Sequence, residues 1–279
     1  MLDEDDVLGE SLEVLSEGEP PPLDGQVSIG DGVALQDLAA AAPYARRLAA
    51  VHRAAGADGV RIDDALAAAE QAASMHRHRL GSLSDRNVLT YLLGAAIDTR
   101  LLRIDTAADR LHPGEEVALI ADHPLAAWGE SLPLVVHRDP LGLPDRATET
   151  CTLLPLLYQY LVRSRDPDLE ACVPGLHREM TSSARRRGAR APSRRDVRRQ
   201  VAALTALLEE FGVVSWQPAG ARLGTARLTF LGAFGWMVLI CDLQGPTPAM
   251  DRMIQDAGYL PAAGGYVHRS RLPVDLCDN

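Results

Sequence analysis

Apolar residues recur at helical spacing along both halves of the chain, and short extended stretches with polar turns interrupt them. In the first half, intervals of three and four residues predict three helices, with Gly56 ending the first and Asp63 capping the second. A hairpin and a short helical closing element follow. The expected elements are helices at 32–56, 63–75 and from 84 or 85, an extended stretch at 59–62, strands at 101–104 and 110–112, and short helical segments at 115–120 and 126–128.

The second half repeats this order of elements. Ser193 and Asp196 form a capping-box pattern at the start of its third helix, and Gly212 ends that helix. Its apolar face consists of Val197, Val201, Leu204, Leu208 and Phe211. The expected elements are helices at 146–163, 169–177 and from 193, strands at 213–216 and 222–229, and a final apolar helix at 230–243.

Three helices followed by a hairpin is the order of a winged helix-turn-helix, in which the third helix reads DNA and the hairpin is the wing. Two copies in one chain predict a mainly α protein with short β-hairpins, built as two tandem winged helix-turn-helix units. The expected layout is an acidic tail at 1–32, a first unit at 33–138, and a second unit at 139–279 that contains a flexible basic loop at 181–192.

The composition favours helices and excludes several enzyme classes as functions of this chain. Only 4% of the 279 residues are aromatic, so the core must consist mainly of Leu, Ala and Val. All 28 basic residues are Arg, and a chain without Lys has neither a P-loop nor an amine for Schiff-base chemistry. His76 and His78 lie among Arg residues and are interpreted as solvated. We therefore expect no catalytic residue, no metal and no cofactor.

Cysteine spacing and apolar runs indicate the compartment. The four cysteines lie far apart and form no Cys-x-x-Cys pair, so we expect them to be reduced and mostly buried. The acidic first residues do not resemble a signal peptide. The longest apolar stretch, at about 228–241, is too short to span a membrane. A cytoplasmic bacterial protein without a membrane partner is expected.

The charge of the chain is strongly segregated. The formal net charge of −10 argues at first against a nucleic-acid partner. Residues 1–37, however, hold 11 acids and no Arg, which leaves 27 acids against 28 Arg in the remainder. The window 178–199 holds nine Arg against two acids, a net charge of +7. The tail is therefore expected to be disordered or loosely attached, and the window is either a surface for a polyanion or acidic partner or a solvated linker.

Three segments occupy the two expected wings and the helices after them: Thr99–Pro113, Asp122–Trp128 and Ala226–Trp236. They resemble the actinobacterial tandem winged-helix proteins, whose hairpin closes with Leu-Thr-Pro-Leu-Gly-Arg-Trp. This chain has Phe230 where Pro is usual, and Ala233-Phe234 where Arg-Trp is usual. The resemblance covers roughly residues 33–245 and implies two winged-helix units with DNA-binding or regulatory work.

The second unit is the better candidate for binding duplex DNA. Its third helix carries four Arg in its first two turns, and Ala202 and Ala206 keep the predicted outer side slim enough for a major groove. The expected DNA contacts are Arg185, Arg186, Arg187, Arg190, Arg194, Arg195, Arg198, Arg199, Arg222 and Arg227. The first unit has acids around its third helix and wing, which favours protein contact or dimerisation.

The tail suggests a regulatory role beside DNA binding. One hypothesis is that residues 3–19 fold back onto Arg185–Arg199 and compete with DNA, and the alternative is a purely solubilising tail. The chain is then a nucleoid-associated transcription regulator. The alternative function is a winged-helix protein-interaction subunit, a dimerisation or kleisin-type scaffold without direct DNA readout. Salt-sensitive retention of DNA favours the first function, and a partner retained at high salt favours the second.

Overall fold

The computed structural model describes residues 32–73, 85–137, 153–154, 156–161, 166–186, 188–232 and 234–235, with the backbone of 259–262 and 265–268. Helices make up most of this part of the chain, and its strands form small antiparallel sheets. The predicted mainly α fold with short hairpins is therefore confirmed. No helix among these residues is long and apolar enough to cross a membrane.

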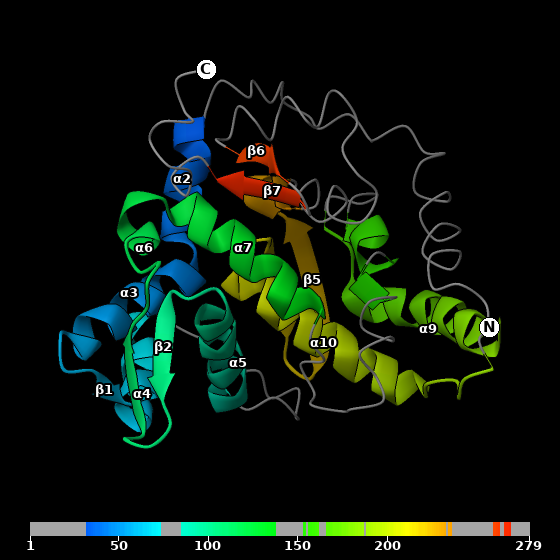
Figure 1. The fold of residues 1–279 in the computed structure, drawn as a ribbon. Coiled ribbons are helices and arrows are strands. Elements are labelled where there is room, and N and C mark those ends of the chain that lie inside the picture. Colours follow the sequence, from blue (N-terminus) through cyan, green and yellow to red (C-terminus); the bar gives the residue numbers. More distant parts are fainter. Residues whose placement is uncertain are drawn as a thin grey trace.

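The first half combines helices with a three-stranded sheet (Figure 1). The central strand β3 pairs on one side with β1 and on the other with β2, so Leu111 lies opposite both Val60 and Ile104. The elements are α2 Gly32–Ala41, α3 Pro43–Ala55, β1 Val60–Arg61, α4 Ile62–Ala72, α5 Asp85–Asp98, β2 Leu102–Asp105, β3 Arg110–Pro113, α6 Leu119–Asp122 and α7 Pro124–His137.

In the second half, two long helices precede a hairpin. The long helix α10 ends at Glu210, and Gly212 terminates it: its φ of 68° lets the Val213 N–H donate to the carbonyl of Leu208 at 2.8 Å and turns the chain into β4. Residues 153–154 and 156–161 are also helical. The elements are α9 Leu169–Arg186, α10 Arg194–Glu210, β4 Val214–Ala219, β5 Arg222–Leu228, β6 Tyr259–Ala262 and β7 Gly265–His268.

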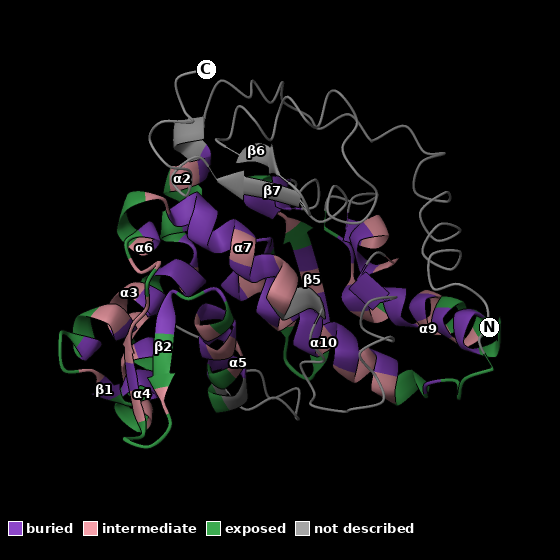
Figure 2. Cartoon of the chain, in the orientation of Figure 1, coloured by how far each residue is buried: buried purple, intermediate pink, exposed green. Residues whose placement is uncertain are grey.

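Both halves contribute to one hydrophobic core. A single cluster of buried apolar side chains includes residues from α2 to Phe234, and Figure 2 shows buried positions along both α7 and α10. The ring of Tyr44 in α3 stacks on Phe211, with ring centroids 4.3 Å apart. The indole N–H of Trp128 in α7 donates to the carbonyl of Phe211 at 2.6 Å. The end of α10 is therefore packed against the first half.

Several element boundaries differ from the sequence expectation. The helix expected at 32–56 is two helices, because Pro43 has no N–H to continue α2 and occupies the first turn of α3. Asp63 does not cap α4, which begins at Ile62. The loop expected at 181–192 is helical as far as Arg186, because Met180 and Ala184 continue the buried face of α9.

Other differences lie in length and in elements that the periodicity did not predict. The closing helix α7 runs over 14 residues instead of three, and the hairpin of β6 and β7 was not expected. The expectations for the acidic tail before residue 32, for the helix start at 146–152 and for the apolar helix at 236–243 lie outside the described residues.

Cys172 confirms the expectation of a reduced, buried cysteine at its position. It is buried in α9, and its Sγ lies 3.3 Å from the carbonyl oxygen of Asp168. Burial raises the pKa of its thiol to about 11, which disfavours the reactive thiolate. The other three cysteines lie outside the described residues.

Candidate nucleic-acid interface

The connection between α9 and α10 is fixed at its C-terminal end. The Ser193 hydroxyl accepts a hydrogen bond from the Asp196 N–H at 3.1 Å, and the Ser193 N–H donates to the Asp196 carboxylate at 3.3 Å. This confirms the capping box predicted from the sequence. His177 Nε2 lies 3.1 Å from the carbonyl oxygen of Pro192, which ties the connection to α9. The side chains around it therefore project from a defined backbone.

Exposed arginines gather at this connection. They come from the end of α9, the linking residues and the first turn of α10: Arg185, Arg186, Arg190, Arg194 and Arg195. Within the described part of the chain, no ion pair involves Arg185, Arg190, Arg194 or Arg195. We call these four residues the basic turn. Arg187 lies outside the described residues.

Three other predicted DNA contacts are engaged by acids at the start of α9. The ion pairs are Arg198 with Glu170 at 2.7 Å, Arg222 with Asp168 at 3.1 Å and Arg227 with Asp166 at 3.2 Å. Three carboxylates thus balance three guanidinium groups on the second hairpin and its supporting helix. The hairpin contributes much less positive potential than its arginines alone indicate. None of these three acids was predicted to lie at the interface.

Glu170 joins three elements. It accepts hydrogen bonds from Nε and Nη2 of Arg198 at 2.7 and 3.1 Å, and from the backbone N–H of Leu223 at 3.1 Å. The same Arg198 donates to the carbonyl of Ala221 at 2.7 Å. The hydrogen bond from Arg198 lowers the pKa of the Glu170 carboxyl, and partial burial opposes that shift. Arg198 is therefore a structural residue that holds the hairpin on α9 and α10.

Replacing Glu170 by Gln is expected to make the protein less stable at neutral pH but less sensitive to acid. The folded carboxyl has a lowered pKa, so its stabilisation is present above the unfolded pKa and is lost as pH falls through the folded value. At pH 7 the variant should lose about 1–2 kcal/mol, near the lower end of the values for a hydrogen bond to a charged group, because solvent screens this partly exposed pair. Urea unfolding between neutral and acidic pH measures the difference, which should shrink as pH falls.

Asp166→Asn is the matched control for that experiment. Its ion pair with Arg227 is exposed on both sides, and exposed pairs contribute little. A constant gap between wild type and Glu170→Gln across the acid range would contradict the assignment of the pKa shift to this pair.

The outer side of α10 is less accessible than the sequence predicted. The inward face is confirmed, since Val197, Val201, Leu204, Leu208 and Phe211 are all buried. On the opposite side Arg195 is exposed, but Arg199 is half-buried, and Ala202 and Ala206 pack partly against the core. Figure 2 shows exposed positions at the N-terminal end of α10. The accessible part of this helix is therefore its first turn, beside the basic turn.

Several arginines of the first half bind partners within that half. Arg86 forms an ion pair with Asp63, and Arg61 pairs with Asp64 at 3.0 Å. Arg110 donates to the backbone carbonyls of Asp58 and Gly59, each at 3.0 Å. Arg46, Arg53 and Arg103 of the first half also form no ion pair among the described residues, but they are spread over α3 and β2, whereas the four arginines of the basic turn lie within 11 residues of the chain.

The chain was compared with protein-family models, curated proteins and solved structures. No protein-family model matches the chain, and neither a curated protein nor a solved structure matches it significantly.

Proposed function

We propose that the chain is a DNA-binding regulatory protein made of two tandem winged-helix units. The order α3, β1, α4, α5, β2, β3, with β1 paired to β3, supports the first unit, because a winged helix-turn-helix has this order. The order α9, α10, β4, β5 supports the second. This proposal also agrees with the resemblance to the actinobacterial tandem winged-helix proteins.

The observation that carries the proposal is the place of the basic turn. In a helix-turn-helix, the N-terminal residues of the recognition helix contact base edges in the major groove. Arg194 and Arg195 occupy that end of α10, and Arg185 and Arg190 flank it. A guanidinium donates two parallel hydrogen bonds to guanine or clamps a phosphate, and the helix dipole adds positive potential at this end.

The proposed interface is smaller than the predicted set of ten arginines. Arg194 and Arg195 contact the major groove, and Arg185 and Arg190 contact adjacent phosphates. Arg186, Arg187 and Arg199 remain proposed contacts beside them. Arg198, Arg222 and Arg227 instead support the hairpin through their acidic partners.

Replacing Arg194 and Arg195 together by Gln is expected to weaken binding of the full chain to duplex DNA by roughly tenfold. It should also reduce the discrimination between duplexes of different sequence, because these two side chains face base edges.

Replacing the phosphate-contacting Arg185 and Arg190 by Gln should instead lower the slope of log affinity against log salt by about 2, because two fewer phosphate counterions are released. A salt titration with random and mixed-sequence duplexes measures the affinity, the discrimination and the slope. The matched control is Arg61→Gln with Arg103→Gln, which removes the same charge from exposed positions of the first sheet. Equal losses in the control and in both basic-turn variants would refute the assignment to the basic turn.

The acidic tail acts in this proposal as a competitor for the same arginines. Its 11 acids within residues 1–37 and the positive window at 178–199 attract each other, so the tail opposes DNA binding in the same chain. Deleting residues 1–24 should therefore tighten DNA binding, most strongly at low salt, where charges are least screened. An affinity that stays the same at low salt would leave the tail as a solubilising segment.

A protein-interaction subunit is the second candidate function. The neutralised hairpin and the half-buried outer side of α10 favour it, because both reduce the surface that faces a DNA groove. Under this function a partner or second copy stays bound at high salt, and the Arg194→Gln and Arg195→Gln changes leave that association unchanged. The same salt titration, with the partner recovered from cells, distinguishes the two.

A further inference from the structure

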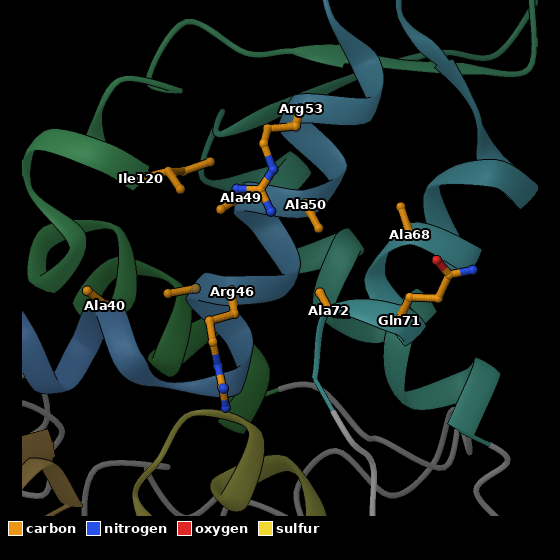
Figure 3. A pocket seen from close by; sticks show the side chains of 10 residues that line it. Ala40, Arg46, Ala49, Ala50, Arg53, Ala68, Gln71, Ala72 and Ile120 are labelled. Atoms are coloured by element: carbon orange, nitrogen blue, oxygen red, sulfur yellow. The ribbon is translucent and has the colours of Figure 1, made fainter.

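A groove on the first half, distant in sequence from the basic turn, has no role in the proposed DNA interface. It has a volume of about 440 Å³ and lies between α3 and α4, with α2 and α6 at its edge (Figure 3). Six of its ten lining residues are Ala, and the other four include two Arg. The lining residues are Ala40, Ala45, Arg46, Ala49, Ala50, Arg53, Ala68, Gln71, Ala72 and Ile120.

The groove has a positive charge at each end. Arg46 and Arg53 are seven residues apart on α3, which corresponds to about 10 Å along a helix axis. Figure 3 shows their side chains at opposite ends of the row of alanines. Both are exposed, and neither takes part in an ion pair within the described residues. The groove therefore suits a short apolar segment that carries acids at both of its ends.

The floor of the groove is preformed. Arg47, the neighbour of Arg46 on α3, is buried and donates to the carbonyl oxygens of Ala69 and Ala73 at the end of α4. These two hydrogen bonds, at 2.5 and 3.1 Å, fix α4 against α3. The backbone of the groove is thus in place before a ligand binds, which lowers the free-energy cost of assembling the site.

We propose that this groove binds the N-terminal segment of the same chain, residues 3–19. Leu8, Leu12 and Leu15 recur at intervals of four and three residues, the spacing of one helix face, and Leu8 and Leu15 are seven residues apart. The acids Asp3–Asp6 precede this apolar stretch, and Glu17 and Glu19 follow it. Docking as an amphipathic helix places leucines on the alanine floor and an acidic end near each arginine.

The connecting chain is long enough for this contact. Sixteen residues lie between Leu15 and Gly32, the start of α2, and the 17 Cα–Cα steps span up to about 56 Å in an extended chain. Ala40, near the end of α2, already lines the groove and lies about 12 Å along the helix from Gly32. The intramolecular arrangement also gives the segment a high effective concentration at the groove.

Docking in the groove holds the tail away from the basic turn. The effect of docking on DNA binding rests on the proposed function, whereas the docking itself does not. The same segment is then either docked on α3 and α4 or free to compete with DNA. Weakening the groove should raise the free fraction and weaken DNA binding in the full chain. The groove thus sets the strength of the competition by the tail.

A photo-crosslinking experiment on the full chain tests the docking directly. A diazirine amino acid replaces Leu12, and mass spectrometry identifies the peptide to which it couples on illumination. Coupling within one chain to peptides of α3 or α4 is the expected result. Coupling only to residues 185–199, coupling between chains, or no intramolecular coupling would each overturn the proposal.

Two pairs of matched variants make the result specific. Ala68→Glu places a carboxylate in the groove and should lower the coupling yield severalfold, whereas Ala67→Glu puts the same charge on the adjacent exposed position of α4 and should not. Arg46→Glu with Arg53→Glu should likewise lower the yield, and Arg61→Glu with Arg103→Glu should not. All these positions are exposed or half-buried, and circular dichroism checks that each variant folds. Equal yields within both pairs would also overturn the docking.

DNA affinity of the same variants separates this proposal from the proposed function. Ala68→Glu should weaken DNA binding in the full chain but not after deletion of residues 1–24. If the coupling pattern holds and no variant binds DNA, the docking stands and the DNA-binding function fails. If DNA binding holds and the coupling is insensitive to the groove variants, the function stands and the docking fails.

Discussion

Replacing Arg47 by Met is expected to lower the free energy of unfolding by about 3–5 kcal/mol, the usual cost of breaking a buried ion pair from one side. Arg47 is 1% exposed, and its Nε and Nη2 donate to the two carboxylate oxygens of Glu210 at 2.6 and 2.9 Å. The variant leaves that carboxylate buried in α10 without its counter-charge. It also leaves the carbonyls of Ala69 and Ala73 without these donors.

Urea unfolding at neutral pH measures this loss, and two further variants identify its cause. Arg46→Met removes the same charge from the adjacent exposed position and should change stability by no more than about 0.5 kcal/mol. Adding Glu210→Leu to Arg47→Met should recover part of the loss, because no unpaired charge then remains buried. A double variant as unstable as Arg47→Met alone would show that the unpaired carboxylate is not the source of the cost.

The partner of Arg47 was beyond the reach of the sequence. Its position on the buried side of α3 is visible in the spacing, since Arg47 lies three residues after Tyr44 and four before Val51, and both are buried. The spacing does not identify the acid that pairs with it, however. Its acid is 163 residues away in the chain, on the other half of the protein. Contacts of this kind depend on tertiary packing, which periodicity does not encode.

The features that the sequence predicted correctly are local ones. The capping box at Ser193, the buried stripe of α10 and its end at Gly212 each depend on residues within one or two helical turns. The turn of the first hairpin is equally local, because Asp105 accepts hydrogen bonds from the N–H groups of Ala107 and Ala108.

The candidate interface was predictable only in part, for the same reason. A count of charges along the window 178–199 finds the basic turn, since exposed residues of one sign near a helix start need no distant partner. The role of Arg222 and Arg227 depends on Asp168 and Asp166, which lie more than 50 residues earlier. The sequence did offer one local signal for these pairs: the acids at 166, 168 and 170 alternate, and their charge is complementary to that of a basic strand.

Replacing Trp128 by Ala is expected to destabilise both halves of the protein together. Trp128 is fully buried in α7 of the first half, and its ring contacts with Phe211 and Phe234 both reach the second half. Its ring centroid lies 6.4 Å from those of Phe211 and Phe234, and its N–H donates to the Phe211 carbonyl. Truncating a buried Trp to Ala costs about 3–5 kcal/mol, and the unpaired carbonyl adds to this loss.

Hydrogen exchange followed by mass spectrometry distinguishes shared from separate stability. If both halves unfold as one unit, peptides from α3 and from the β4–β5 hairpin should lose protection by the same factor in Trp128→Ala, because both depend on one global opening. Phe230→Ala, at a 38% exposed position after β5, should leave both nearly unchanged. Loss of protection confined to the first half would show that units 33–138 and 139–279 are stable separately. Joint loss would mean that a change in one unit alters the stability of the other, which is the physical coupling a regulatory role requires.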